Sequence, residues 1–379
     1  IMEIKLKSYF IEIPDDRLNL FSKIKNKLDK NNLYDKIITD IQTIDIIDPK
    51  KFKSIKNDEK ALAGARCIIQ NWIEAKKNEV LHFITDENHI KEADIFELAA
   101  FECGVIPKIT ILSSDGVQSG EVIEKMKGTM YYSDVIIGAT HYSFITTKAV
   151  DYALKKGSRF LSFPMHTNDS SSIFEREFIR MSPKVAKRIG QPLAEEITKA
   201  DKVLVKTKKG TNVAFGIAGR RAGIFAGSCT KKGKVASSSF EVYVPIIETM
   251  TNGVVIADGS LGYLGAIKNP IELVFENGYL VEINGKEDAT RLKKYMESFG
   301  DKEIYCAAEL GIGLNTKSKC EGICYIEDES TYKTFHIGFG RNIALGGNHE
   351  ARGHFDIVTH KPDIFVDDIM VMQEGEIAK

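Results

Sequence analysis

The sequence predicts an α/β domain with a mostly parallel sheet over residues 1–195, followed by a β-rich domain, curved or barrel-like, over residues 196–379. Three observations predict this division. A chain of 379 residues is longer than one ordinary hydrophobic core requires. Strand-like and helix-like segments alternate in the first half. In the second half, short strand-like segments between glycine and asparagine turns replace them.

The first half is predicted to carry parallel strands joined by helices. Residues 1–60 mix helical periodicity with isoleucine-rich pieces, and Pro14 followed by two aspartates is typical of a helix start. After a helix at 60–77, strands are expected at 80–85, 105–112, 134–138 and 158–163, and helices at 93–103, 122–127 and 142–156. This alternation implies βαβ crossovers and helices on both faces of the sheet. A helical bridge at 174–199, interrupted near its two prolines, leads into the second half.

Two histidines follow predicted strands of the parallel sheet. His141 comes after the strand at 134–138 and His166 after the strand at 158–163. Loops at the carboxyl ends of parallel strands are where such sheets bind ligands, so either histidine would face a cleft, or it is an exposed loop residue. No G-x-G-x-x-G or Walker-type glycine loop follows any of these strands, which argues against a nucleotide-binding role.

The pattern in the second half predicts β-hairpins. Strands are predicted at 202–206, 212–215, 253–257, 272–275 and 279–283, and one helix at 288–299. The Asn277-Gly278 pair is a strong type I′ signal, and residues 207–211 form a second predicted hairpin turn. These features predict a strongly curved β-rich domain.

Composition excludes several classes of protein. Lys and Arg number 52 against 53 Asp and Glu, so the net charge of −1 leaves no electrostatic footprint for nucleic acid. No apolar run is long enough for a membrane span, and the first residues lack the layout of a signal peptide. Six cysteines make no disulfide framework, and Cys320 and Cys324 are interpreted as reduced thiols rather than zinc ligands. We expect a cytoplasmic protein without nucleic-acid or membrane partners.

The residues with metal-binding chemistry lie in the second half. Four of the eight histidines fall between His336 and His360. In the fragment His354-x-Asp356, positions i and i+2 of a strand point to one face, so an imidazole and a carboxylate can share a metal ion. Glu309 precedes two glycines that let the backbone approach a ligand, and Glu241 lies on an alternating strand. We predict one metal pocket formed by Glu241, Glu309, His336, His354 and Asp356.

These fragments also carry a family resemblance. The chain resembles the thermophilic aminopeptidase T (leucyl aminopeptidase-like) metallopeptidase family, including the related 2,5-dihydroxypyridine 5,6-dioxygenase. The resemblance covers about residues 200–379 and rests on Phe240-Glu-Val-x-x-Pro245, Gly259, Ala308-Glu-Leu-Gly-Ile-Gly-x-Asn315, Asp328-Glu329, Thr334-x-His336-Ile-Gly-x-Gly340, Gly346-Gly347, His354-x-Asp356, Asp367 and Gly375-Glu-Ile.

The resemblance implies an aminopeptidase-like hydrolase that removes N-terminal amino acids from peptides, commonly as a homodimer. The five predicted ligands would hold two divalent ions (zinc, cobalt or manganese) with a bridging water as nucleophile, and Glu241 and Glu309 would be catalytic. The alternatives are a ring-cleaving dioxygenase with a single Fe(II), or a binding protein without catalysis. Two departures bear on the choice: the family peptidases have a tyrosine where this chain has Ile343, with Tyr332 or Arg341 as nearby substitutes, and the stretch between His336 and His354 is shorter than expected for a peptidase.

Overall fold

The computed structural model describes residues 58–114, 121–130, 132–145 and 147–378. The helical periodicity and isoleucine-rich pieces predicted within residues 1–57 lie outside the described residues. None of the described helices is long and apolar enough to cross a membrane.

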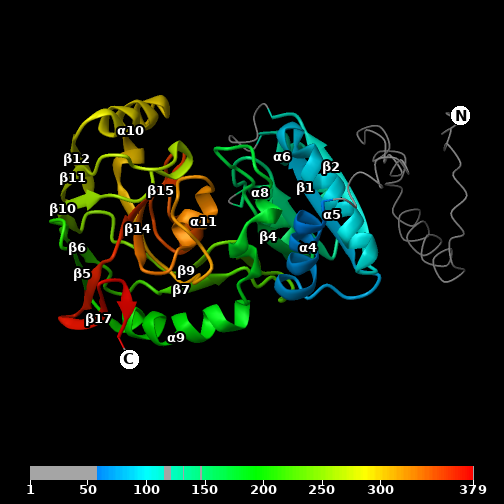
Figure 1. Cartoon of the computed structure of the whole chain (residues 1–379), viewed down its shortest axis with the longest axis horizontal. Coiled ribbons are helices and arrows are strands. Elements are labelled where there is room, and N and C mark those ends of the chain that lie inside the picture. Colours follow the sequence, from blue (N-terminus) through cyan, green and yellow to red (C-terminus); the bar gives the residue numbers. More distant parts are fainter. Residues whose placement is uncertain (1–57, 115–120, 131, 146, 379) are drawn as a thin grey trace, which may run out of the picture. The chain divides into compact units, whose positions relative to one another are not determined.

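A parallel sheet of five strands follows the first helices, as predicted (Figure 1). Its strands are β1 (Val80–Asp86), β2 (Ile106–Leu112), β3 (Val135–Ala139), β4 (Arg159–Ser162) and β8 (Val235–Ser237), in the order β2-β1-β3-β4-β8. Every pair in this sheet is parallel. The last strand, β8, comes from beyond residue 195, and the domain boundary predicted there stays a prediction.

Helices lie on both faces of this sheet because alternate strand residues feed two cores. Leu81 and Phe83 of β1 belong to the core under α4 (Glu59–Cys67) and α5 (Ile90–Glu102). Ile84 and Phe160 belong to a second core that includes α8 (Lys148–Lys155). The remaining elements here are the π-helical turn η1 (Ile68–Trp72), η2 (Glu87–His89), α6 (Glu121–Lys125) and α7 (Lys127–Met130).

Two helix predictions need correction. The helix expected at 142–156 begins only at Lys148, because Thr147 caps its first turn by accepting a hydrogen bond from the backbone N–H of Val150. The bridge expected at 174–199 consists of η3 (Ile173–Glu175), η4 (Glu177–Arg180) and α9 (Pro183–Lys199). Pro183 occupies the first turn of α9, where proline is tolerated, and Pro192 lies inside the helix without ending it.

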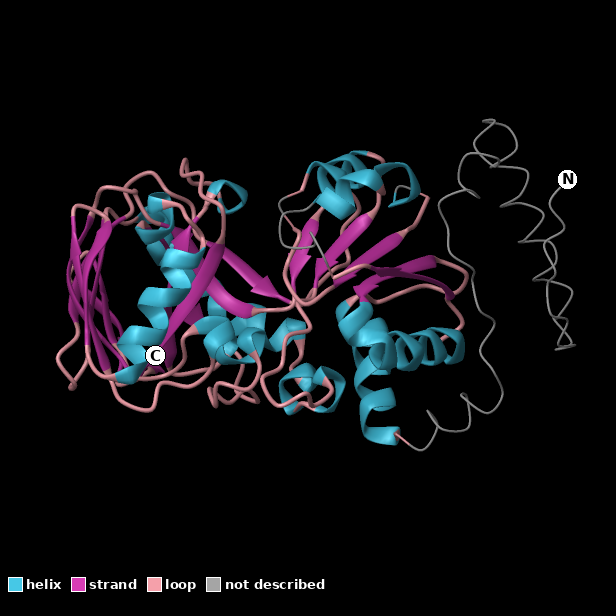
Figure 2. Cartoon of the chain, turned by 90° about the horizontal axis from the view of Figure 1, so that it is seen from above, coloured by secondary structure: helices cyan, strands magenta, loops and turns pink. Residues whose placement is uncertain are grey.

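The second half is built from two antiparallel sheets (Figure 2). The eight-stranded sheet has the order β12-β11-β10-β6-β5-β16-β17-β18, and the five-stranded sheet has the order β15-β14-β13-β9-β7. Within the described residues neither sheet closes on itself, so the barrel-like form predicted from the sequence is wrong and the β-rich class is confirmed. Asn277 and Gly278 both have positive φ (49° and 91°), as the predicted type I′ turn between β11 and β12 requires.

The strands predicted at 202–206, 212–215, 253–257, 272–275 and 279–283 are present with closely similar bounds. The eight-stranded sheet contains β5 (Lys202–Lys206), β6 (Asn212–Gly216), β10 (Thr251–Ala257), β11 (Ile271–Glu276), β12 (Tyr279–Asn284), β16 (Asp363–Val366), β17 (Ile369–Gln373) and β18 (Glu376–Ile377). The five-stranded sheet contains β7 (Gly223–Ala226), β9 (Phe240–Pro245), β13 (Ala307–Gly313), β14 (Thr334–Gly340) and β15 (His354–His360). The helical elements are η5 (Gly262–Leu264), α10 (Glu287–Ser298), η6 (Lys302–Tyr305), α11 (Tyr325–Ser330) and η7 (Ile343–Leu345).

Helix α11 is placed against the five-stranded sheet. It packs on β9, β13, β14 and β15, and the helix itself is orange in Figure 1. All six of its residues are buried, which is unusual for so acidic a sequence. The buried carboxyl groups of α11 therefore require hydrogen-bond or ion-pair partners, or they take part in a functional site.

Candidate metal centre

Four adjacent strands of the five-stranded sheet carry the five predicted ligands. Glu241 lies on β9, Glu309 on β13, His336 on β14, and His354 and Asp356 on β15. Two groups form: donor atoms of Glu241, Glu309 and His336 lie within 4.8 Å of one another, as do donor atoms of Glu309, His354 and Asp356. Glu309 belongs to both groups. The structure thus brings together all five residues that the sequence singled out.

The register of the strands explains how the ligands converge. Gly338 of β14 is the partner of both Glu309 and Asp356, so it stands between these two carboxylates. Gly311 of β13 is the partner of His336. Glu309 of β13 is followed two residues later, on the same face, by Gly311, which lies opposite His336. His336 of β14 is followed in the same way by Gly338, which lies opposite Glu309 and Asp356.

These glycines leave the space that the donor side chains fill. A Cβ on Gly311 would stand 1.9 Å from Nε2 of His336. A Cβ on Gly338 would stand 2.8 Å from Cε1 of His354 and 2.9 Å from Oδ1 of Asp356. The Glu-x-Gly and His-x-Gly spacings in the sequence are therefore a packing requirement of this centre.

Hydroxyl donors orient two of the carboxylates. Ser239 Oγ donates to Oε1 of Glu241 over 2.6 Å, and the hydroxyl of Tyr325 donates to Oδ2 of Asp356. In each carboxylate the second oxygen is buried and receives no hydroxyl or amide donor: Oε2 of Glu241 faces only the imidazole of His336, and Oδ1 of Asp356 only that of His354. A buried carboxylate oxygen without a donor is costly, and a cation relieves that cost.

The two imidazoles are held differently. His354 Nδ1 lies 2.8 Å from the backbone carbonyl of Arg341, which fixes its tautomer and directs Nε2 toward Glu309 (3.1 Å) and Asp356 (3.5 Å). His336 Nε2 lies 2.8 Å from Oε2 of Glu241, and its Nδ1 has no partner within the described part of the chain. The residues present therefore fit a bound divalent cation, because five oxygen and nitrogen donors converge and Oε2 of Glu241 and Oδ1 of Asp356 face only imidazoles.

Burial and the charges of neighbouring donors shift the pKa values of the groups in the metal-free site. Burial raises the pKa of Glu309 to about 7, although His354 acts in the opposite direction. Burial would lower the pKa of His336, but the neighbouring Glu241 outweighs it and raises that pKa to about 9. Burial would raise the pKa of Asp356, but His354 outweighs it and lowers that pKa to about 2. Without a cation, the site is a set of carboxylates neutralised by imidazolium groups.

Sequence reasoning missed two residues that touch this site. Tyr325 donates to Asp356, and its ring stacks on Tyr263 with centroids 4.2 Å apart. Glu329 of α11 is fully buried, and burial together with the Asp356 charge raises its pKa well above the usual range. The acidic run at the end of α11 was a visible signal, but only the packing of α11 on the sheet turns Tyr325 and Glu329 toward Asp356.

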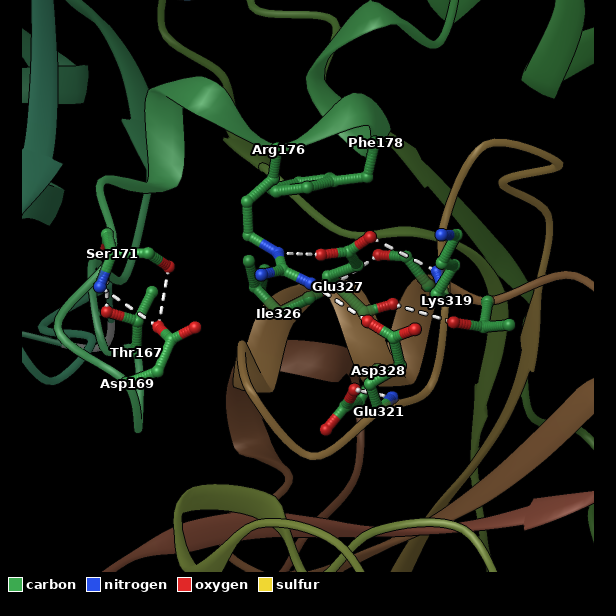
Figure 3. A network of polar contacts seen from close by, with 12 residues as sticks. Thr167, Asp169, Ser171, Arg176, Phe178, Lys319, Glu321, Ile326, Glu327 and Asp328 are labelled. Carbon is green, nitrogen blue, oxygen red and sulfur yellow. Dashed lines mark hydrogen bonds and ion pairs between the residues drawn. The ribbon is translucent and has the colours of Figure 1, made fainter. Parts of the chain in front are cut away.

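A buried ion pair holds α11 to the first half of the chain (Figure 3). Arg176, between η3 and η4, pairs with Glu327 of α11, and its Nη2 lies 3.8 Å from Oε2 of Glu321. Glu327 Oε1 also accepts from the backbone N–H of Lys319 at 3.1 Å. These contacts fix the helix that carries Tyr325 and Glu329.

Of the two substitutes considered for the missing tyrosine, Tyr332 does not take its place. Ile343, at the position of that tyrosine, is 45% exposed. The hydroxyl of Tyr332 donates to Oε2 of Glu376 at 3.2 Å, away from the predicted ligands. Arg341 contributes its backbone carbonyl to His354.

The fold and the site together define a two-part enzyme architecture, with a parallel α/β region and an antiparallel region that carries a candidate metal centre. Residues 76–379 match the family described as 2,5-dihydroxypyridine 5,6-dioxygenase (NicX), and the chain belongs to this family. The relationship predicted from the sequence is thereby confirmed.

Individual relatives agree with the family. A segment of 131 residues is 28% identical to 2,5-dihydroxypyridine 5,6-dioxygenase of Pseudomonas putida, covering 32% of this chain and 37% of that protein. The solved structure of 2,5-dihydroxypyridine dioxygenase from Pseudomonas putida KT2440 matches with a TM-score of 0.70 at 17% identity, over 84% of this chain and 96% of that one. AmpT from Thermus thermophilus matches with a TM-score of 0.57 at 14% identity, over 85% and 100%. The last two likenesses show a shared fold.

Proposed function

We propose that this protein is a metal-dependent ring-cleaving dioxygenase, which opens a hydroxylated, pyridine-type aromatic ring with molecular oxygen. The observation that carries the proposal is the group formed by Glu309, His354 and Asp356 in a chain that belongs to the NicX family. The proposal departs from the hydrolase predicted first from the sequence and adopts its stated alternative.

In this proposal Fe(II) would be held by Glu309, His354 and Asp356. Iron supplies the oxygen chemistry that no side chain of the chain can supply. The residues around it orient the donors: the Arg341 carbonyl sets the tautomer of His354, and Tyr325 occupies Oδ2 of Asp356, so that Oδ1 is the oxygen that faces His354. The donor set has one imidazole and two carboxylates, which differs from the two imidazoles and one carboxylate of most non-haem iron oxygenases.

A two-ion aminopeptidase is the second candidate, and one observation favours it. Glu309 belongs to both donor groups, so it has the position of a bridging carboxylate between two divalent ions, the second held also by Glu241 and His336. Under this reading Glu241 and Glu309 are the catalytic carboxylates. Ile343 argues against it, because loss of one oxyanion donor costs about 2.7–4 kcal/mol in acyl-transfer sites.

Metal stoichiometry and reaction separate the two candidates. The full chain is purified without chelator, reconstituted under nitrogen with Fe(II) or with zinc, cobalt or manganese, and assayed in parallel. We expect one iron per chain and oxygen uptake with 2,5-dihydroxypyridine. Two zinc, cobalt or manganese ions per chain with release of amino acids from dipeptides, and no oxygen uptake, would replace the dioxygenase by the hydrolase. Failure to take up any metal at neutral pH would leave the non-catalytic binding protein. A homodimer and a cytoplasmic location remain predictions.

A further inference from the structure

A bulge in strand β13 lies directly beside one of the candidate metal ligands. Ala307 pairs with Phe339 of β14, and Glu309 pairs with Gly338, the residue just before Phe339. Ala308 is therefore an extra residue of β13 that pairs with no residue of β14 in the described sheet. A bulge of this kind changes the direction of the side chain next to it. The contacts of Ala308 therefore set the direction of Glu309, which belongs to both donor groups.

Asn342, in the loop that follows β14, holds this bulge. Its side chain is fully buried, and its Nδ2 donates to the carbonyl of Ala308 at 3.1 Å. The same carbonyl accepts from the backbone N–H of Ile246, the residue after β9, at 3.0 Å. Both lone pairs of the Ala308 carbonyl are thus used, one by a neighbouring strand and the other by Asn342.

The neighbours of Asn342 determine the orientation of its amide. Oδ1 accepts from the backbone N–H of His349 at 2.8 Å, and Nδ2 also donates to Oε1 of Glu248 at 3.1 Å. A backbone N–H can only donate and a backbone carbonyl can only accept, so a flipped amide would lose the bonds to His349 and Ala308 together. The donating side of the amide therefore faces Ala308.

The residue before Asn342 orients the histidine that faces Glu309. The backbone carbonyl of Arg341 lies 2.8 Å from Nδ1 of His354. Nε2 of the same imidazole lies 3.1 Å from Oε2 of Glu309. Asn342 is therefore joined on one side to the bulge that directs Glu309 and on the other to the carbonyl that directs His354. A displacement of Asn342 would move these two donors relative to each other.

The loop after Asn342 closes against that residue. The backbone N–H of Asn342 donates to the carbonyl of His349 at 3.1 Å, and its carbonyl accepts from the backbone N–H of Gly347 at 3.1 Å. A Cβ on Gly347 would stand 2.1 Å from Cγ of Asn342, so only glycine lets the loop come this close to the amide. Arg220 holds the same loop at a second point by donating to the carbonyl of Gly346 at 3.2 Å.

We infer that Asn342 is a positioning residue of the candidate metal centre, which sets the carboxylate of Glu309 against the imidazole of His354. The inference goes beyond the proposed function and rests on it only in taking Glu309 and His354 as ligands of one cation. These two donors belong to the same group in both candidate reactions, so the role of Asn342 is the same in either. Asn342 acts through the backbone of Ala308 and Arg341.

Asn342→Asp tests the donor of the amide. The change keeps an oxygen for the N–H of His349 but sets a carboxylate oxygen against the carbonyl of Ala308, which repels it. Affinity of the full chain for Zn²⁺ should fall by about 10–100-fold. The visible spectrum of the Co²⁺-loaded chain, which reports the geometry of the ligands, should also change. Arg220→Ala is the matched control: it loosens the same loop at Gly346, so it should lower the melting temperature but keep the wild-type metal affinity and spectrum.

A second pair of variants displaces the amide without changing its chemistry. Gly347→Ala pushes a methyl group against Asn342, whereas a Cβ on Gly346 would meet no described atom within 4 Å. Because φ of Gly346 is 98°, Gly346→Ala strains the loop and is the control for stability alone. Gly347→Ala should weaken Zn²⁺ binding, and Gly346→Ala should not.

The outcomes separate this inference from the proposed reaction. Wild-type Zn²⁺ affinity and Co²⁺ spectrum in Asn342→Asp and Gly347→Ala would overturn the role of Asn342, and so would an equal loss of affinity in each variant and its control. An iron-loaded wild type that takes up no oxygen with 2,5-dihydroxypyridine would instead overturn the proposed reaction and leave the role of Asn342 in place. A wild type that binds no Zn²⁺ would overturn the candidate centre and both proposals.

Discussion

Gly311 lies directly opposite His336 in the β13–β14 pair, and a Cβ on that glycine would stand 1.9 Å from Nε2 of the imidazole. The candidate metal centre is thus a hollow in a sheet face, made by glycines and filled by donors from the adjacent strands. Most of the predictions below follow from that hollow and from the hydrogen bonds around it.

Gly311→Ala should displace His336. Overpacking of this kind costs about 1–3 kcal/mol of stability. His336 belongs to the group with Glu241 and Glu309, so under the two-ion candidate the affinity for the ion held by that group should fall by at least about tenfold. Calorimetric titration of the metal-free chain with Zn²⁺ and thermal unfolding check both effects. Gly128→Ala is the matched control, since nothing lies within 4 Å of a Cβ there. Unchanged metal affinity in Gly311→Ala would show that His336 is not a ligand.

Glu309→Gln should abolish catalysis and leave the fold intact. Glu309 is the residue shared by both donor groups, so either proposed reaction loses its metal geometry when this carboxylate becomes an amide. Circular dichroism and thermal unfolding of the metal-free variant should match the wild type, while oxygen uptake and amino-acid release are both absent. Activity in the Glu309→Gln variant would show that Glu309 is not a ligand of the metal centre.

Tyr325→Phe should reduce metal affinity by about 10–100-fold, the usual effect of losing a hydrogen bond to a ligand. The ring should still stack on Tyr263, so the melting temperature should change little. Tyr332→Phe is the control, because its hydroxyl bonds to Glu376 instead. Equal metal affinities in the two variants would mean that the Tyr325 hydroxyl does not orient Asp356.

Metal affinity should rise with pH. The pKa of His336 is raised to about 9 by Glu241, which outweighs burial, and Asp356 and Glu309 raise that of His354 well above its ordinary value. A protonated imidazole cannot bind a metal, so the cation must displace these protons. Competition titrations with Zn²⁺ between about pH 6 and 9 should show affinity increasing throughout, and proton release in buffers of different ionisation enthalpy. Affinity independent of pH would contradict this view of the histidines.

Arg176→Ala should destabilise the fold by about 3–5 kcal/mol, because it leaves the carboxylate of Glu327 buried without its cation. Burial already raises the pKa of Glu327 in spite of Arg176, so the loss should grow as pH rises and Glu327 ionises. Urea unfolding at several pH values measures this. The exposed pair between Lys155 and Asp151 gives the control, since Lys155→Ala should change stability by less than about 0.5 kcal/mol. Equal effects would mean that the Arg176 pair is not buried in solution.

Much of this molecule was readable from local patterns. The alternation of strands and helices predicted the parallel sheet, because burial on both faces demands continuous apolar strands. The Asn277-Gly278 turn was predictable because few other pairs adopt two positive φ angles. The five candidate ligands were found because the His-x-Asp spacing, the histidine cluster from His336, the glycines after Glu309 and the alternating strand of Glu241 are short-range features.

Other properties depend on contacts between distant segments, which no local pattern reports. Whether a sheet closes into a barrel depends on pairing between edge strands that lie far apart in the sequence. The edge strands of these two sheets do not pair within the described residues, so both sheets stay open. The position of α11, and with it the contact from Tyr325 to Asp356, is decided by packing and by the Arg176–Glu327 pair across 151 positions of sequence. The sequence by itself determined the strands and the donors. Tertiary structure decided which carboxylate oxygens accept from a hydroxyl and which face an imidazole, because hydrogen-bond partners come together only when the segments meet.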